Sequence, residues 1–324
     1  MNAFRSALVT GATGFIGSAL VRRLLAENIQ VYTLLRATSK NRSVLDSLSG
    51  IELLEVPSVQ TEHLRKGLAG VSADIVFHLA SYGVNHLDRD MDALIEDNVG
   101  FVARLLEVTA KWPVRRFVHT GSCSEYGMAS SEGSYFCEEQ PLSPISLYGA
   151  AKAASVLYAN ALAIRLGVPF VTLRLFGVFG IGEAAQRLVP YLIDRLQSNQ
   201  PVDLTPGEQV RDFLYVDDVV EAFLAAARCE ALAPYQAYNV CSGKAVSIRE
   251  MGEIIANELN SPRHLLQWGT RPYREDEAMW IVGNNRRFVE ATHWTPKTSV
   301  VEGVRRVIAA AEARGRETAP KHGF

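Results

Sequence analysis

Gly11-Ala-Thr-Gly-Phe-Ile-Gly17 joins a short apolar run, residues 6–9, to a helical stretch, residues 14–27. The first glycine permits a tight turn, the second lets a pyrophosphate approach the backbone, and the third allows the helix to pack closely on the strand. Free N–H groups at the helix N-terminus then attract phosphates. An ordinary strand–helix turn is the alternative, but the flanking strand and helix are the context that the dinucleotide motif requires. We therefore predict a dinucleotide site with these ligands: Gly11, Thr13, Gly14, Phe15, Ile16 and Gly17.

Short apolar runs and helical stretches alternate through the first half of the chain. Further strand-like runs cover residues 30–35, 51–55, 74–79, 116–120 and 170–174, and the long helical stretches cover residues 93–111 and 146–165. Near-continuous apolar strands separated by helices predict a parallel sheet covered on both faces. Right-handed crossovers make such a sheet doubly wound. We therefore expect an α/β fold with a dinucleotide-binding Rossmann domain over residues 1–175.

The second half of the chain has shorter elements and more proline, glycine and arginine. Residues 217–227 predict a helix, residues 238–240 a strand, and residues 247–259 a helix whose Ser247/Glu250 spacing fits a capping box. We expect residues 176–324 to form mainly a smaller α/β lobe over the carboxyl edge of the sheet. Some segments of about residues 210–245 return to the first domain in this interpretation, and the tail after Arg314 is expected to be frayed.

Composition and charge narrow the class of partner. Hydrophobic residues make up 48% and charged residues 21% of the 324 residues, which is enough for a sizeable core. The formal net charge of -2 gives no electrostatic reason to expect nucleic acid or a membrane surface as a partner. No apolar run approaches the ~18 residues of a membrane helix. Four cysteines without a CxxC pair indicate neither zinc nor a disulfide framework, and no secretory pattern precedes the first strand, so we expect a cytoplasmic protein without a metal.

The end of the second strand distinguishes the two nicotinamide cofactors. An acidic residue there would accept a hydrogen bond from the ribose 2′-hydroxyl. Residues 34–40 read Leu-Leu-Arg-Ala-Thr-Ser-Lys instead. Arg36 can stack on adenine and pair with a 2′-phosphate, assisted by Ser39 or Lys40. We therefore predict NADP, with NAD as the alternative if Arg36 is only a solvated surface residue.

Three side chains suit carbonyl/alcohol redox chemistry. Tyr148 and Lys152 stand at i and i+4 of a predicted helix and so share a face. A tyrosine with a pKa near ~10 is a poor base at neutral pH unless a neighbouring ammonium favours its phenolate. Ser122 follows a strand at the edge where ligands gather in open α/β sheets, and Ser124 is the weaker candidate beside it. Alone, the pattern would also fit a half-buried tyrosine, a surface lysine and serines that satisfy a turn.

Together the glycine turn, residues 74–80, Asn98, the Ser122 segment and Tyr148xxxLys152 resemble the extended short-chain dehydrogenases/reductases. More narrowly, they resemble the epimerase/dehydratase family of nucleotide-sugar enzymes, over about residues 6–296. The resemblance implies Tyr148 as general acid/base, Lys152 as its pKa modulator and a ribose ligand, and Ser122 as a donor to the substrate oxygen. It also implies that the cofactor contacts His78, Leu79, Ala80 and Asn98; His78 alone would read as a packed histidine.

The resemblance assigns the substrate diphosphate to arginines of the smaller lobe. Arg211 is the first candidate, and its alternative is a structural ion pair with Asp212 or Asp217. Arg274 and Arg187 are further candidates. Many members of the family carry asparagine where this chain has Gly177, so one diphosphate contact is expected to be missing.

Three reactions share this scaffold: reduction, epimerisation and dehydration of a nucleotide-linked sugar. In the family's 4,6-dehydratases, Asp and Glu follow the Ser/Thr donor, but Cys123 and Ser124 stand there in this chain. Glu125 is one position further on, where a variant elimination would find an acid. Our leading hypothesis is an NADPH-dependent reductase of a nucleoside-diphosphate 4-keto-6-deoxyhexose. The alternatives are an epimerase or dehydratase that holds NAD(P) tightly, or a non-catalytic NADP(H) sensor or scaffold.

The resemblance also predicts a homodimer through a four-helix contact. The helices at residues 93–111 and 146–165 would form it, although their apolar stripes equally suit an intramolecular core.

Overall fold

A parallel sheet forms from the apolar runs of the first half and one strand of the second. In this computed structural model, residues 4–39, 41–46, 48–84, 88, 90–275 and 277–318 are described. The sheet has seven strands in the order β11-β6-β5-β4-β1-β2-β3, and every neighbouring pair is parallel. Their bounds are β1 (Ser6–Thr10), β2 (Gln30–Arg36), β3 (Ile51–Val56), β4 (Ile75–His78), β5 (Arg116–Ser122), β6 (Phe170–Leu175) and β11 (Gln236–Val240).

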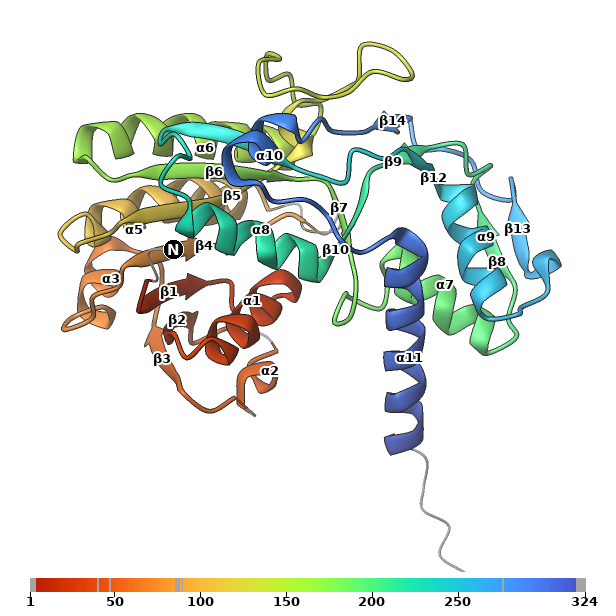
Figure 1. Ribbon diagram of the computed structural model, residues 1–324, viewed down its shortest axis with the longest axis horizontal. Coiled ribbons are helices and arrows are strands. Elements are labelled where there is room, and N and C mark those ends of the chain that lie inside the picture. The colour runs from red at the N-terminus through yellow and green to blue at the C-terminus, as the bar shows by residue number, and fades with distance from the viewer. Residues whose placement is uncertain are drawn as a thin grey trace, which may run out of the picture.

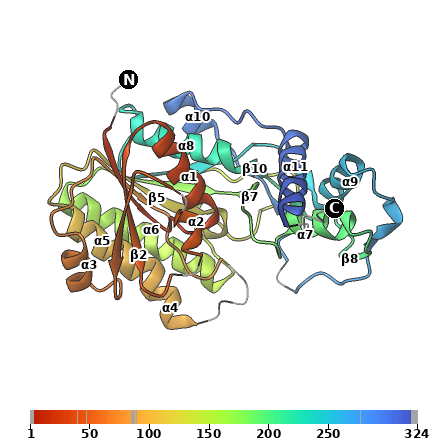
Figure 2. The same ribbon diagram turned by 90° about the horizontal axis from the view of Figure 1, so that it is seen from below.

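Helices cover both faces of this sheet, so the predicted doubly wound α/β fold is confirmed (Figures 1 and 2). One face packs against α1 (Phe15–Ala26) and α8 (Val216–Arg228), with α10 (Arg286–Thr292) beside β11. The other face packs against α3 (Thr61–Gly67), α5 (Phe101–Thr109) and α6 (Leu147–Leu166). The short helix α2 (Ser43–Asp46) lies between β2 and β3. The order of strands reverses at β1 and β4, which is where such sheets bind ligands.

The helix predicted over residues 93–111 is broken into three parts. It begins as α4 (Met91–Ile95), widens into one π-helical turn, η1 (Glu96–Gly100), and continues as α5. Single π turns inside a helix are frequent at functional sites. This turn carries Asp97 and Asn98, whose side chains face the cofactor end of the sheet as described below.

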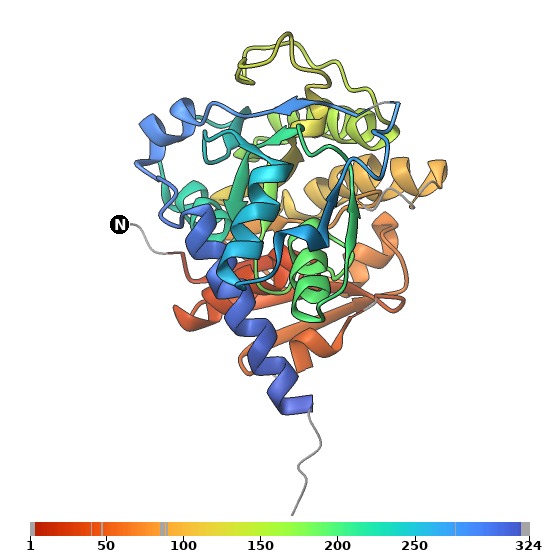
Figure 3. The same cartoon turned by 90° about the vertical axis from the view of Figure 1, so that its right-hand side faces the viewer.

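A smaller lobe lies beyond the carboxyl ends of the strands (Figures 1 and 3). Its own core joins Leu192, Met251, Ile255 and Val304 from three helices. Those helices are α7 (Leu188–Gln197), α9 (Ile248–Glu258) and α11 (Val300–Thr318). Short strands complete the lobe and its junction with the sheet: β7 (Gly177–Phe179) with β10 (Phe213–Tyr215), β8 (Val202–Leu204) with β13 (Leu266–Trp268), and β9 (Val210–Arg211) with β12 (Val246–Ser247) and β14 (Trp280–Ile281).

One feature of the second half differs from the sequence expectations, and another agrees with them. The helix α11 continues to Thr318, so the segment from Arg314 to that residue is helical rather than frayed, and residues 319–324 lie outside the described part. Ser247 caps α9 by accepting from the Glu250 N–H, 3.0 Å away. Of the helices described, none combines the length and the apolar character needed to cross a membrane.

Candidate active site

The glycine turn has no room for side chains at two of its positions. Gly11 has a φ of +71°, and a Cβ there would lie 2.6 Å from the backbone nitrogen of Ala80. A Cβ on Gly17 would overlap the carbonyl oxygen of Gly11. The Gly14 N–H donates to that same carbonyl (3.0 Å), and α1 begins at the next residue. Since Gly14 is the N-cap and has no side chain, the first N–H groups of α1 are left for an anion, as a pyrophosphate site requires.

The end of β4 lies directly beside this turn. The Leu79 N–H donates to the Thr10 carbonyl (3.2 Å), and the Ala80 N–H donates to the Thr10 hydroxyl oxygen (3.3 Å). The backbone after β4 is thereby fixed next to Gly11, which brings the predicted cofactor residues Leu79 and Ala80 to the glycine turn.

The ring of His78 is buried behind the sheet edge rather than presented at it. A hydrogen bond of 2.7 Å joins its Nδ1 to the Thr10 hydroxyl, and the ring stacks on His119 with centroids 5.4 Å apart. Burial, and then the charge of Lys152, lowers the pKa of His78 to about 3, so the ring is neutral. His78 is therefore packed in the core, as its sequence context alone suggested, and only its backbone lies near the cofactor edge.

Asn98 uses its whole side-chain amide to hold the loop after β4. Its Oδ1 accepts from the Ser81 hydroxyl (2.8 Å) and the Tyr82 N–H (3.3 Å). Its Nδ2 donates to the carbonyls of Tyr82 (3.0 Å) and Leu94 (2.9 Å). All hydrogen-bonding groups of the amide are used in these contacts, so the side chain does not bind a ligand directly. Asn98 instead positions the backbone around Ser81.

Arg36 ends β2, beside the glycine turn, and is already paired. Its Nη1 donates to both carboxylate oxygens of Asp97, at 3.0 and 2.8 Å. Its backbone N–H donates to the Ser39 hydroxyl oxygen (3.0 Å). Lys40, the other predicted helper, lies outside the described residues. Sequence reasoning missed Asp97, because nothing local connects the turn after β4 with the end of β2.

Ser122 and Tyr148 come together at the carboxyl end of β5. The Tyr148 hydroxyl is in hydrogen-bonding reach of the hydroxyls of Ser122 and Ser81. Burial raises the pKa of Tyr148 to about 12, and the two hydroxyls oppose that rise. Tyr148 is therefore a neutral phenol at pH 7. Ser81 was not predicted from the sequence; its place directly after Leu79 and Ala80, two predicted cofactor residues that follow β4, is the signal that was available.

Lys152 lies one turn further along α6 and is 1% exposed. Burial lowers its pKa to about 8, and Glu125 raises it against that effect. His119 is also neutral, since burial and then Lys152 lower its pKa well below the usual value. The ammonium thus lies in poorly solvated surroundings, where Glu125 supplies a countercharge.

Glu125 supports Ser122 from inside the protein. It is 0% exposed, and its Oε1 accepts from the Ser122 N–H at 2.7 Å. Its Oε2 accepts from Arg174 Nε, also at 2.7 Å, while Arg174 Nη1 donates to the Tyr126 hydroxyl (2.9 Å). A Cβ on Gly121 would lie 2.7 Å from Glu125 Oε1, so this glycine makes the room for the pair. Glu125 therefore cannot reach a substrate as an elimination acid.

Ser124 and Cys123 complete the turn after β5. The Ser124 N–H donates to the Ser122 hydroxyl oxygen (3.1 Å), which orients that hydroxyl. Burial raises the pKa of the Cys123 thiol to about 12, despite Arg211 nearby, so it is a neutral thiol at pH 7.

The junction with the smaller lobe is held by a buried carboxylate, Asp212. It accepts from the N–H and hydroxyl of Ser242 (2.6 and 2.7 Å) and from the N–H groups of Gly243 (2.9 Å) and Gly283 (3.4 Å). A Cβ on Gly177 would lie 2.7 Å from the Asp212 carbonyl oxygen, which explains why asparagine does not fit there.

The three predicted substrate arginines have different surroundings. Arg211 donates to Glu277 (2.6 Å), so its partner is neither Asp212 nor Asp217. Arg187 is the N-cap of α7 and lies 3.5 Å from Glu183. Arg274 is exposed in the turn that leads to Glu277. Arg211 lies close to the turn after Ser122, as its effect on the pKa of Cys123 indicates.

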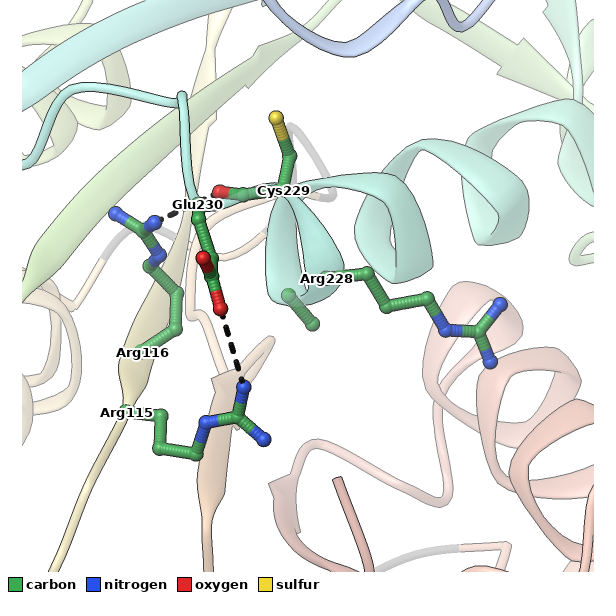
Figure 4. A pocket seen from close by; sticks show the side chains of 6 residues that line it. Arg115, Arg116, Arg228, Cys229 and Glu230 are labelled. Carbon is green, nitrogen blue, oxygen red and sulfur yellow. Dashed lines mark hydrogen bonds and ion pairs between the residues drawn. The ribbon is translucent and has the colours of Figure 1, made fainter. Parts of the chain in front are cut away.

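A cavity of about 230 Å³ lies at the other edge of the sheet, where β5 begins (Figure 4). The Arg116 guanidinium donates there to the carbonyls of Leu232 and Cys229, both at 2.9 Å. These two backbone acceptors after α8 thereby have hydrogen-bond partners. The cavity lies at the start of β5, whereas Ser122 lies at the end of that strand. It is lined by Arg115, Arg116, Ala227, Arg228, Cys229 and Glu230.

Comparison with known proteins agrees with this arrangement. The model of the NAD dependent epimerase/dehydratase family matches residues 7–241. The CDP-abequose synthase of Salmonella muenchen is 28% identical over 94% of this chain and 97% of its own. The dTDP-6-deoxy-L-talose 4-dehydrogenase (NAD(P)(+)) of Kitasatospora kifunensis is 28% identical over 93% of this chain and 92% of its own. The structure of MoeE5 in complex with UDP-glucuronic acid and NAD is similar with a TM-score of 0.82 at 27% identity, over 95% of this chain and 99% of that one. This chain therefore belongs to the NAD dependent epimerase/dehydratase family.

Proposed function

We propose that the protein is an NADPH-dependent reductase of a nucleoside-diphosphate 4-keto-6-deoxyhexose. Its relatives support the general class of this function, an oxidoreductase that acts on nucleotide sugars with a nicotinamide cofactor. The specific reaction, reduction at C4 of a 6-deoxysugar, is supported by the relative named as a dTDP-6-deoxy-L-talose 4-dehydrogenase. Such an enzyme interconverts an alcohol and a ketone at C4 of a 6-deoxysugar, and reduction is the same step in reverse.

The observation that carries the choice of reaction is the turn after Ser122. A dehydratase needs an acid/base pair to remove a C5 proton and expel a leaving group. In the positions where the family's dehydratases hold that pair, this chain has the neutral thiol of Cys123 and the hydroxyl of Ser124. The nearest acid, Glu125, is buried against Arg174. Simple reduction needs neither acid.

The catalytic side chains suit the direction of reduction. When bound, NADPH would supply the hydride to the carbonyl carbon. Tyr148, protonated at neutral pH, donates its proton to the sugar oxygen as the alcohol forms, and Ser122 donates a hydrogen bond to the same oxygen. Lys152 supplies positive charge beside them in a site where burial strengthens electrostatic effects.

Binding is assigned to the residues described above. The glycine turn receives the pyrophosphate, the chain at Leu79 and Ala80 contacts the nicotinamide half, and Arg36 meets the adenosine ribose. Arg211, assisted by Arg187 and Arg274, binds the sugar diphosphate, for which Arg211 exchanges its contact with Glu277.

A nucleotide-sugar epimerase is the second candidate. The favouring observation is the pairing of Arg36 with Asp97, which offers a carboxylate to a ribose hydroxyl and so suits NAD. An epimerase would keep its cofactor and return the hydride to the sugar.

The test follows nicotinamide absorbance with purified protein, NADPH and a panel of nucleotide-linked 4-keto-6-deoxysugars, with matched NADH runs. Stoichiometric loss of NADPH that disappears in Tyr148→Phe is the expected result. Protein that emerges from purification with bound NAD(P) and converts unreduced nucleotide sugars, without net cofactor change, would instead establish an epimerase or dehydratase. A Tyr148→Phe variant that keeps every measured function would point to a sensor or scaffold.

A further inference from the structure

The ion pair between Arg36 and Asp97 joins two elements that are far apart in the sequence. Arg36 ends β2, and Asp97 belongs to the π-helical turn η1 after β4. One guanidinium nitrogen contacts both carboxylate oxygens, at 3.0 and 2.8 Å. The Asp97 side chain is 14% exposed and the Arg36 side chain 46%. The carboxylate is therefore the enclosed partner, and the arginine reaches it from a more open position.

The turn that carries Asp97 is held rigidly. The next residue, Asn98, is buried and makes four hydrogen bonds to the loop after β4 and to α4. On the other side, Glu96 pairs with Arg104 (2.8 Å) on α5. Asp97 is thus fixed from both neighbours, whereas the long side chain of Arg36 is free to turn about its own bonds. Any ligand at the end of β2 meets a fixed carboxylate and a movable guanidinium.

These two groups favour different cofactors. In Rossmann folds, an acid at the end of the second strand accepts a hydrogen bond from the 2′-hydroxyl of NAD, and an arginine accommodates the 2′-phosphate of NADP. Here β2 ends in the arginine, and the acid comes from η1 instead. A 2′-phosphate must therefore draw Arg36 away from Asp97 and accept a like charge close by, while a 2′-hydroxyl finds an acceptor without disturbing the pair.

We propose that Asp97 determines the cofactor preference of this protein by holding Arg36. It weakens the selection of NADP(H) that Arg36 alone would produce and lets the protein accept NAD(H) as well. The inference rests on the proposed function only in placing the adenosine ribose at the end of β2. It does not depend on which sugar reaction follows.

The experiment measures Kd for NADP⁺ and NAD⁺ by titration calorimetry with the protein and three variants. In Asp97→Asn, the ratio of the two constants shifts toward NADP⁺ by at least about tenfold, which corresponds to about 1.4 kcal/mol. In Arg36→Ala, NADP⁺ binds at least about tenfold more weakly, and NAD⁺ is little affected. Asp92→Asn is the matched control, because it removes the same charge at an exposed position of α4 whose side chain takes part in none of the contacts described for Arg36 or η1; its ratio stays at the wild-type value.

Three results would overturn the inference. An unchanged ratio in Asp97→Asn, with an unchanged Tm, means that the pair does not select. An equal weakening of both cofactors means that Asp97 only supports the turn. An equal shift in Asp92→Asn means that the net charge of this region acts rather than the contact with Arg36. Since binding is measured without turnover, failure of the reductase assay leaves this test intact.

Discussion

The hydroxyl of Tyr148 has two neighbouring hydroxyls, and both affect its protonation. Burial raises the pKa of Tyr148 to about 12, and the hydroxyls of Ser81 and Ser122 each oppose this rise. In the neutral site Ser81 donates to Asn98 (2.8 Å), and because a hydroxyl hydrogen rotates, it can turn to the phenolate when Tyr148 ionises, which lowers the pKa of Tyr148. Together, Ser81 and Asn98 link Tyr148, the proposed catalytic acid, to the loop after β4.

Replacement of Ser81 should therefore change the pH profile of the reverse reaction. In Ser81→Ala, the pKa of Tyr148 rises further, so less phenolate is present at any given pH to take the proton from the alcohol. We expect oxidation of the sugar alcohol by NADP⁺ to slow by about 2- to 10-fold, the effect of one lost hydrogen bond. The rise of its rate with pH, measured as kcat/KM up to about pH 10 (the unperturbed tyrosine pKa), should therefore be displaced to higher pH, with a lower rate than wild type at each pH.

Ser124→Ala is the matched control for this change. Its hydroxyl is not among the groups that hydrogen-bond to Tyr148, and its own contact to Ser122 is made by its backbone N–H, which the variant keeps. A pH profile that moves equally in both variants would contradict a role for Ser81 on Tyr148.

Glu125 acts on Lys152 and on stability at the same time. Glu125 raises the pKa of Lys152 against burial, so Glu125→Gln lowers that pKa further below about 8. The ammonium is lost as the pH rises through this pKa. We therefore expect the alkaline fall of the reductase rate to begin at lower pH in the variant. A purely structural role would lower the rate at all pH values alike.

The same variant leaves Arg174 without its countercharge. Removal of one partner from a buried pair typically costs about 3–5 kcal/mol in the free energy of unfolding, which urea denaturation at pH 7 would measure. The pair is shielded from solvent, with Glu125 0% and Arg174 6% exposed, so solvent screening reduces this effect little. An unchanged unfolding free energy would show that the pair contributes nothing net.

At the scale of elements, Asp212 connects β9, the chain after β11 and the chain after β14. Three of its acceptor contacts are to backbone N–H groups, two on the β11 side and one on the β14 side. The preceding residue, Arg211, is the proposed diphosphate ligand. The position of that arginine therefore depends on the carboxylate beside it.

Asp212→Asn should weaken this junction. The amide turns a donor toward groups that already donate, which we expect to lower the unfolding free energy by about 3 kcal/mol. KM for the nucleotide sugar should rise more than Kd for NADPH, because Arg211 moves while the glycine turn does not. Asp203→Asn, in an exposed position of β8, is the control and should stay within about 0.5 kcal/mol of wild type. Equal losses in both constants would contradict a local effect.

At the scale of the whole molecule, α6 is apolar on more than its buried face. Ala159 and Ala163 face the sheet, but Leu157, Tyr158 and Ile164 are 64%, 57% and 56% exposed. Exposed apolar clusters of this kind mark interaction surfaces. Figure 2 shows α4 and α5 beside α6 on the same side of the sheet. We propose that this side forms the homodimer contact.

Leu157→Glu tests that contact. A charge in the centre of an apolar interface should weaken dimerisation by at least about tenfold, since buried apolar anchors dominate such interfaces. Sedimentation velocity over a dilution series measures the effect. Met128→Glu, at another exposed apolar residue outside the helices, should leave association unchanged. A wild-type protein that is monomeric throughout the series would contradict the proposal.

The doubly wound sheet and its glycine turn were predictable, because apolar periodicity and turn chemistry are properties of short segments. The strands at residues 6–9 and 170–174, the turn at Gly11 and the Tyr148/Lys152 spacing all follow from neighbours in the chain. Such segments keep their preference whatever surrounds them. Helix α7 and the length of α11 were missed, since their stability comes from packing on one another rather than from a strong local signal.

The partners of the charged side chains were not predictable. Glu125 meets Arg174 from 49 residues away, Arg211 meets Glu277 from 66, and Arg36 meets Asp97 from 61. Each pair forms because neighbouring strands and turns bring their ends together, and that register depends on every crossover between them. Local spacing was therefore enough to identify the candidate catalytic residues. Which of them are neutral, paired or free was settled by burial and by contacts across the sheet, and those exist only once the chain is folded.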